Sequence, residues 1–88
     1  MVSVRTVVAH DELHRDGEAL VLLDGRVHRV SPVGTLIRAR ARAGATVEEL
    51  ATVLEAELGP PGDGTTLELT RQAVQALLEA GLLEAVAG

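Results

Sequence analysis

The sequence predicts an α+β domain in which an N-terminal three-stranded antiparallel β-sheet is followed by a three-helix bundle. The sheet is predicted by a β-branched segment, 2–8, and by two segments, 19–23 and 26–30, that flank the tight-turn pair Asp24-Gly25. Apolar residues at helical spacing predict three helices, at 32–43, 46–58 and 66–80. A chain of 88 residues is the size of one domain, so we expect a single domain over 1–88.

The strand boundaries follow from residue type and alternation. Residues 2–8 predict a first strand, whereas residues 10–18 are polar and predict a loop. Residues 19–23 are almost wholly apolar, which is typical of a central strand covered on both faces. Residues 26–30 alternate, which predicts a strand with two distinct faces. These faces are Val27 with Arg29, and Arg26 with His28 and Val30.

Capping residues mark where the helices begin and end. Ser31-Pro32 can begin a helix, because the hydroxyl accepts a free backbone N–H and proline fits the first turn. Thr46-Val-Glu-Glu49 is a capping box, and Gly81 is a natural left-handed cap for the third helix. The Gly- and Pro-rich loop 59–64 lacks the Gly-Lys-Ser/Thr ending of a phosphate-binding loop, which excludes that kind of site.

Composition excludes several classes of function. The chain has no Cys and no Phe, Tyr or Trp, which excludes disulfides, thiolate metal sites, a cysteine nucleophile and stacking of nucleobases on aromatic rings. No apolar run reaches the ~18 residues that a membrane span requires, and no signal peptide is indicated. We therefore expect a soluble cytoplasmic protein with no membrane partner.

The net charge of −5 conceals a separation of charge along the chain. Residues 45–88 contain eight acids and only one basic residue, Arg71. Residues 26–44 contain no acid, and their basic residues are Arg26, Arg29, Arg38, Arg40 and Arg42. A solvated helix face often explains such a run. A basic binding surface is an equal alternative here, because the cluster adjoins an expected strand edge.

Candidate catalytic and metal-binding residues are few. His10 and His14 have the i, i+4 spacing of a two-histidine metal face on a helix, but they fall in a polar segment beside strand signals. His28 has no obvious nucleophile near it, because Ser31 is better explained as a helix cap. The thirteen carboxylates lie mostly on outward helix faces. We therefore expect no enzyme activity, no catalytic residue, no metal and no cofactor.

Three stretches resemble the PqqD-like peptide-binding domains, also called RiPP recognition elements. Leu20-Val-Leu-Leu-Asp-Gly-Arg-Val-His-Arg-Val-Ser-Pro-Val-Gly-Thr-Leu-Ile37 is similar to that family's hairpin leading into its first helix. Thr46-Val-Glu-Glu-Leu50 resembles the opening of its second helix, and Leu77-Leu-Glu-Ala-Gly-Leu-Leu83 resembles the close of its third. The resemblance covers residues 20–83 and implies a winged-helix-like fold.

The same resemblance implies a stand-alone adaptor for the biosynthesis of a ribosomally synthesised, post-translationally modified peptide. Such a domain binds the leader of the precursor peptide and delivers it to a modifying enzyme, which is a radical enzyme, peptidase, cyclase or dehydratase. The leader is expected to pair as an added strand beside residues 26–30 and to lie against the third helix. The peptide-binding residues implied are Arg26, Val27, His28, Arg29, Val30, Arg38, Arg71, Val74, Gln75 and Leu78. A rim of Arg26, Arg29, Arg38 and Arg42, expected at the surface, would speed the encounter with an acidic leader.

Two features depart from the family pattern. Aromatic residues are common in the family's strand and first helix, and this chain has none. Arg38 and Arg40 also stand at positions that are usually apolar. Because Arg40 follows the inward residue Ile37 by three positions, it either extends its charge to the surface, pairs with an acid such as Glu79 or Glu84, or faces a partner surface.

A winged-helix transcriptional regulator is the alternative interpretation. Three helices with a β-hairpin also build DNA-binding domains, and the clustered arginines could contact phosphates. The third helix would enter the groove of the DNA, yet it carries Arg71 against Glu68 and Glu79. Phosphates would repel such a helix, so we expect no nucleic-acid partner.

Overall fold

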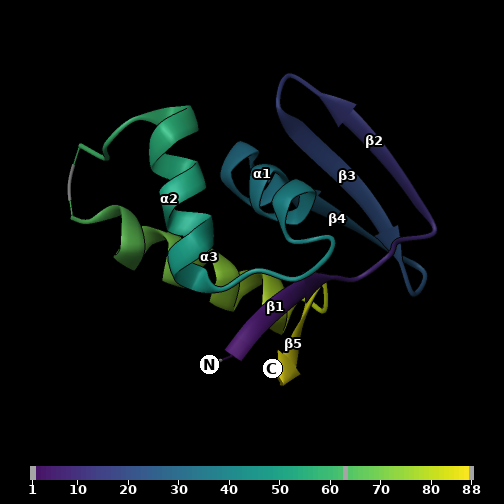
Figure 1. Ribbon diagram of the computed structural model, residues 1–88. Coiled ribbons are helices and arrows are strands. Elements are labelled where there is room, and N and C mark those ends of the chain that lie inside the picture. Colours follow the sequence, from purple (N-terminus) through teal and green to yellow (C-terminus); the bar gives the residue numbers. More distant parts are fainter. Residues whose placement is uncertain (1, 63, 88) are drawn as a thin grey trace.

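The part of the chain that the structure describes forms two antiparallel sheets and three helices (Figure 1). This computed structural model describes residues 2–62 and 64–87. The helices are α1 (Pro32–Arg40), α2 (Val47–Leu58) and α3 (Thr66–Glu79). The strands are β1 (Val2–Thr6), β2 (Asp11–Arg15), β3 (Glu18–Leu23), β4 (Arg26–Val30) and β5 (Leu83–Ala87). The predicted α+β class, with a three-stranded antiparallel sheet and three helices, is confirmed.

The strands of the three-stranded sheet differ from the prediction, because the sheet has the order β2-β3-β4 and does not contain β1. Residues 10–18 are not a loop: they supply β2 and a second tight turn at Asp16-Gly17. Both turns have positive φ at both central residues, +53° and +81° at Asp16-Gly17 and +52° and +75° at Asp24-Gly25. This is the geometry of a type I′ hairpin turn. The sheet is therefore built from two consecutive hairpins.

The predicted first strand has a different partner. β1 ends at Thr6 and pairs antiparallel with β5, which joins Val4 to Ala85 and Thr6 to Leu83. On its other side Val4 exchanges backbone hydrogen bonds with Ala45, at 2.8 and 2.9 Å. β1 is thus held between the C-terminal strand and the segment that follows α1.

β3 is central, as predicted, but only one of its faces is covered. Ala19, Val21 and Leu23 point inward and are buried. Leu20 and Leu22 point outward and are 44% and 38% exposed. The apolar run predicted a strand covered on both faces, and this is wrong because, among the described residues, the core and the packed helix α1 lie on the inner face. The sheet's outer face therefore carries exposed leucines.

The helix starts are as predicted. The Ser31 hydroxyl accepts the Gly34 N–H at 3.2 Å, and Thr46 and Glu49 form both hydrogen bonds of the capping box, at 2.9 and 3.1 Å. α1 ends at Arg40 rather than Ala43, because the Ala41 carbonyl accepts the Thr6 N–H of β1. None of the helices among the described residues is long and apolar enough to span a membrane.

α1 is the central helix of the core. It packs on β1, β3 and β4 on one side and on α2 and α3 on the other, as the ribbon in Figure 1 shows. Its Ile37 is fully buried and meets the inward side chains of the sheet and of the other helices. The buried apolar residues form one cluster, with Val21, Leu50 and Val74 among its members.

The start of α1 approaches β4 so closely that only glycine fits at position 34. A Cβ at Gly34 would lie 2.8 Å from Val30 Cγ1 and 3.6 Å from Leu77 Cδ2. A contact of 2.8 Å is a clash, so Gly34 fixes the distance between α1, β4 and α3.

We expect Gly34→Ala to lower the free energy of unfolding by up to about 2 kcal/mol. Overpacking costs about 1 to 3 kcal/mol and outweighs the gain of about 1 kcal/mol in helix propensity. Urea denaturation measures the change. Val30→Ala removes the clashing methyl group, so the double variant should lose less than the sum of the two single losses. Additive losses would contradict the close approach.

Candidate functional site

The predicted strand 26–30 has one free edge. β4 pairs with β3 alone among the described strands and ends the sheet. Leu23 and Arg26 flank a two-residue turn, and residues in that position exchange hydrogen bonds with each other. Since hydrogen-bonded pairs alternate along the strands, the N–H and C=O groups of Val27 and Arg29 point to the free edge. These backbone groups can pair with an added strand.

A groove of about 490 Å³ lies beside this strand, between β4 and α3. It combines backbone hydrogen-bonding groups at the edge of a sheet with an apolar helical wall. Four of the predicted residues, Val27, His28, Arg29 and Val30, line it from β4. The remaining lining residues are Ser31, Gly34, Ala73, Ala76, Leu77, Ala80 and Leu82.

The wall of this groove on α3 consists mainly of alanines. Ala73, Ala76 and Ala80 recur at intervals of three and four residues, so they share one face of the helix. Arg71 lies nine residues before Ala80, about two and a half helical turns, and therefore points to the opposite side of α3. Gln75 is exposed and donates a hydrogen bond to Glu79 at 3.2 Å.

The other two predicted α3 residues contribute to the core instead. Val74 is only 3% exposed, and Leu78 packs against the buried cluster. None of the four predicted α3 residues, Arg71, Val74, Gln75 or Leu78, lines the groove. The predicted helix, α3, does line the groove, but with residues other than the four predicted ones. The spacing of the alanines was the sequence signal that could have identified the lining face.

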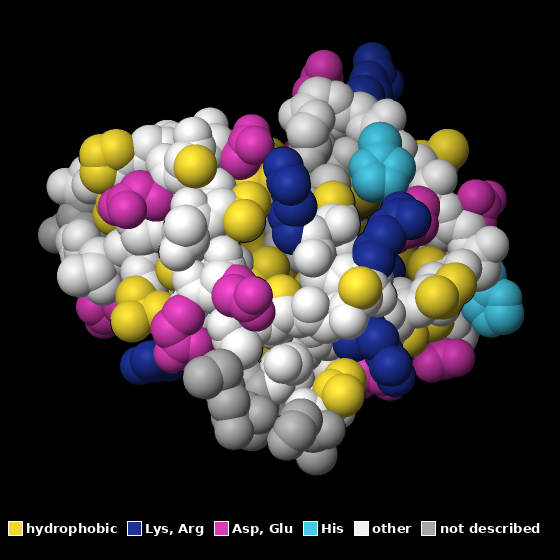
Figure 2. Space-filling model, viewed as in Figure 1, with side chains coloured by type: hydrophobic (Ala, Val, Ile, Leu, Met, Phe, Trp, Pro, Cys, Tyr) yellow, Lys and Arg dark blue, Asp and Glu magenta, His cyan; other side chains and the backbone are white. Residues whose placement is uncertain are grey.

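Arg29 is the arginine that lines the groove, whereas the predicted residue Arg26 begins the same strand and does not line it. Both side chains are exposed, and Arg29 donates a hydrogen bond to Glu18 of β3 at 3.1 Å. Such an exposed pair is weak and can be exchanged for another acid at little cost. Figure 2, viewed as in Figure 1, shows dark-blue arginines at several separate places on the visible face, with magenta carboxylates between them.

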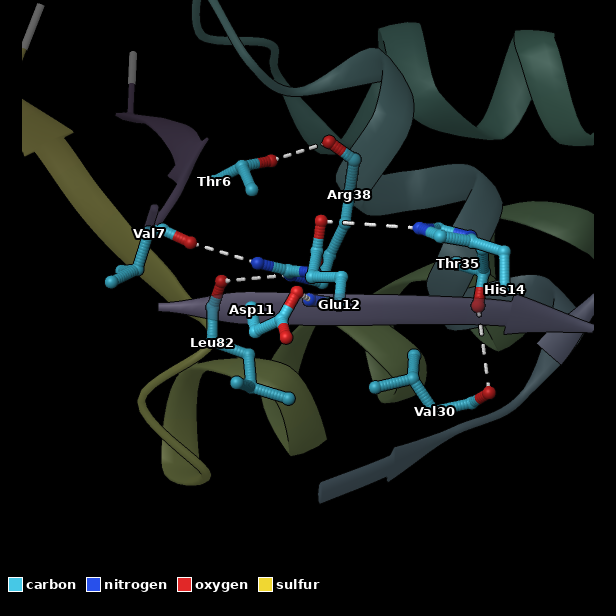
Figure 3. Close-up of polar contacts among 9 residues, drawn as sticks. All are labelled: Thr6, Val7, Asp11, Glu12, His14, Val30, Thr35, Arg38 and Leu82. Atoms are coloured by element: carbon cyan, nitrogen blue, oxygen red, sulfur yellow. Dashed lines mark hydrogen bonds and ion pairs between the residues drawn. The ribbon is translucent and has the colours of Figure 1, made fainter. Parts of the chain in front are cut away.

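Arg38 was predicted to lie at the surface, and this is wrong. Its side chain is buried, and its hydrogen bonds are satisfied within the chain. The guanidinium pairs with Glu12 of β2, and also donates to the carbonyls of Val7 at 2.8 Å and Leu82 at 3.4 Å (Figure 3). The residue is only 5% exposed. In addition, the Thr6 hydroxyl donates to the Arg38 carbonyl at 2.6 Å. Arg38 therefore joins β1, β2 and the segment between α3 and β5 to α1, and does not belong to a rim of the groove.

The other arginines of α1 and its C-terminal end also lie away from β4. Arg42 lines a separate hollow of about 340 Å³, together with Arg38 and residues of the 6–9 segment and β2. Arg40 is half exposed and pairs with Glu57 of α2 at 3.2 Å, rather than with Glu79 or Glu84. The basic run in the sequence is therefore distributed over several sides of the molecule.

The histidines do not form the helical pair that their spacing suggested. His14 lies on β2, with Nε2 3.9 Å from a Glu12 carboxylate oxygen, and His10 precedes that strand. Within residues 2–62 and 64–87, no group of three or more His, Asp or Glu side chains is arranged to hold a metal ion.

No protein-family model, no curated protein and no solved structure matches the chain. The resemblance to the PqqD-like domains therefore stays a prediction.

We expect Glu12→Ala to lower the free energy of unfolding by about 3 to 5 kcal/mol, because it leaves a buried guanidinium without its counter-charge. The matched control is Glu84→Ala, which removes the carboxylate from the exposed Arg5–Glu84 pair and should cost about 1 kcal/mol or less. Urea denaturation compares the two. Combining Glu12→Leu with Arg38→Met should recover much of the loss. Equal losses for the two single variants would show that burial of the pair has no energetic consequence.

Proposed function

We propose that this protein is an adaptor that binds an extended segment of a precursor peptide and delivers it to a peptide-modifying enzyme. The observation that carries the proposal is a free strand edge, β4, that runs along a groove walled by α3. Strand addition is a recurring way of binding peptides, in which backbone hydrogen bonds supply affinity and pockets for alternate side chains supply specificity. The resemblance of residues 20–83 to the PqqD-like domains supports the same proposal.

The alanine wall favours a peptide with large side chains. Side chains of an added strand alternate between the two faces of the sheet, so every second one would point toward Ala73, Ala76 and Ala80. These methyl groups leave room for bulky apolar groups. Since this chain has no aromatic residue, the peptide would supply the large side chains that fill the groove. We therefore propose a leader with large apolar residues at alternate positions.

The charge near the edge favours acidic residues at the remaining positions. Val27 and Arg29 point to the outer face of the sheet, and Arg26 begins the strand. Acids on the outward side of the peptide could replace Glu18 as the partner of Arg29. Charges at such a rim speed association and set the register more than they tighten binding. The proposed adaptor carries no chemistry of its own, so the partner enzyme would be the radical enzyme, peptidase, cyclase or dehydratase.

The regulator alternative is disfavoured by the polar side of α3. The exposed charged residues on that helix are Arg71, Glu68 and Glu79. A helix with more acids than bases is repelled by the phosphates on either side of a DNA groove.

We expect the leader of a precursor peptide encoded beside this chain to bind in the nanomolar to micromolar range and to shift the amide signals of residues 26–30. Arg29→Pro should weaken binding at least tenfold, because proline removes an edge N–H without removing a bond to β3. The matched control is His14→Pro on the opposite edge of the sheet, which should bind the leader normally. Titration by heteronuclear NMR measures both. Amide shifts confined to other elements would refute the site.

Charge reversal separates the adaptor from the regulator. Arg26→Glu combined with Arg29→Glu should slow association with an acidic leader and flatten its salt dependence, with about 0.2 to 1 kcal/mol of affinity lost per residue. Arg42→Glu, on the other side of α1, should change neither, and stopped-flow fluorescence follows the rates. Duplex DNA that bound with a log–log salt slope of about −0.9 per phosphate, together with no binding of the leader, would favour the regulator.

A further inference from the structure

The sheet has a second free edge, at β2. This strand pairs only with β3 among the described strands, so the sheet ends there as it does at β4 (Figure 1). Arg15 and Glu18 flank the second two-residue turn, so the backbone groups of Glu12 and His14 point away from β3. Consistent with this, the Glu12 N–H donates to the Asp11 carboxylate at 2.9 Å. An unpaired edge of this kind is a template for another strand.

The charges along β2 are ordered so that the strand is complementary to itself. It reads Asp11-Glu-Leu-His-Arg15, with two acids before the central Leu13 and two basic residues after it. Antiparallel pairing centred on Leu13 places Asp11 opposite Arg15 of a second copy and Glu12 opposite its His14. Asp11 and Arg15 are opposite charges at facing positions, which stabilise an antiparallel pair, and the imidazole of His14 can donate a hydrogen bond to the facing Glu12 carboxylate. We propose that two copies of this chain pair through β2 and form a continuous six-stranded sheet with a two-fold axis at Leu13.

The hydrogen-bonding pattern selects the same register. The N–H and C=O groups of Leu13 point to β3, so the two Leu13 residues form a non-hydrogen-bonded pair with closely spaced side chains. Glu12 of each copy then faces His14 of the other, and the backbone groups of these two residues form a hydrogen-bonded pair on either side of the axis. Centring the pairing on residue 12 would place Glu12 against Glu12, and a parallel arrangement would place every charge against its own kind. Only the Leu13 register satisfies both the charges and the backbone.

The apolar outer face is continuous with this interface. Leu13 is 67% exposed and lies opposite Leu20 on β3. Pairing therefore places the leucines of the two copies in one row across the joined sheets. Glu12 points to the inner face, where its contact with Arg38 holds β2 against α1. This contact lies within one chain, so β2 is held in place in the monomer as well.

β4 does not have this self-complementarity. Its residues Arg26, His28 and Arg29 are basic or neutral, and no acid lies on the strand. Antiparallel pairing of β4 with itself would centre one His28 on another and gather four arginines at one interface. Self-association therefore uses β2 and leaves β4 free, with one groove at each end of the six-stranded sheet.

A single five-residue strand buries less surface than a standard interface, so the dimer should be weak and depend on concentration. Analytical ultracentrifugation from about 10 µM to about 1 mM should show a monomer–dimer equilibrium. Asp11→Arg and Arg15→Asp should each weaken it about tenfold or more, because each places like charges opposite each other twice. The two single variants mixed together, and the double variant, should associate again. A monomer across the whole range, or a dimer indifferent to both substitutions, would overturn the proposal.

Cross-linking tests the register independently. The chain has no cysteine, so Leu13→Cys introduces a single thiol at the axis, and mild oxidation should link two copies. The matched control is Val27→Cys, which has the same 67% exposure and the same sheet face but lies on β4, and it should stay monomeric. Equal cross-linking of both variants would overturn the β2 interface. His14→Pro should abolish the dimer and Arg29→Pro should leave it intact, so this result is independent of whether a peptide binds at β4.

Discussion

The buried guanidinium of Arg38 holds together parts of the chain that no sheet ladder joins. It contacts the Glu12 carboxylate on β2, the Val7 carbonyl after β1 and the Leu82 carbonyl before β5. The backbone carbonyl of Arg38 also accepts a hydrogen bond from the Thr6 hydroxyl. An aliphatic side chain at this place would fill the same volume without fixing the position of any of these partners. A guanidinium needs acceptors in defined directions. The two sheets are therefore held in one arrangement around α1, and the groove between β4 and α3 depends on that arrangement.

Local signals predicted the helices well, because capping and spacing act within a few residues. Ser31, Thr46 and Glu49 make the hydrogen bonds expected of them. The sheet was harder to predict, because strand pairing depends on distant residues. Residues 10–18 supply β2 and the turn of a hairpin although they are polar, since β2 has one open face and one open edge. Asp16-Gly17 was the overlooked turn signal. The pairing of β1 with β5 joins opposite ends of the chain, and no local pattern encodes it.

The candidate site also has one part that local sequence predicted and one part that it did not. β4 could be placed because two residues of turn fix its register against β3. The α3 wall could not be placed, because the broad apolar surface of that helix is compatible with several rotations about its axis. The packing of Val74 and Leu77 selects one of them, and this turns the alanines rather than Arg71 and Gln75 toward β4. Arg38 is the clearest failure: a charge in a basic run predicted exposure, whereas Glu12, distant in sequence, makes its burial possible.

The alanine wall has a consequence for how such a groove can diverge between related proteins. Removing a methyl group by an alanine-to-glycine change costs about 1 kcal/mol in a helix, so such a wall changes more readily by the addition of atoms. Replacing one of Ala73, Ala76 or Ala80 with a larger residue would fill the part of the groove beside that residue. The helix itself would lose little, because long straight side chains are also good helix formers. The edge of β4 would be unchanged by such a step. Related proteins could therefore change which peptide side chains the groove accepts, one alanine position at a time, while the peptide backbone would still pair with β4.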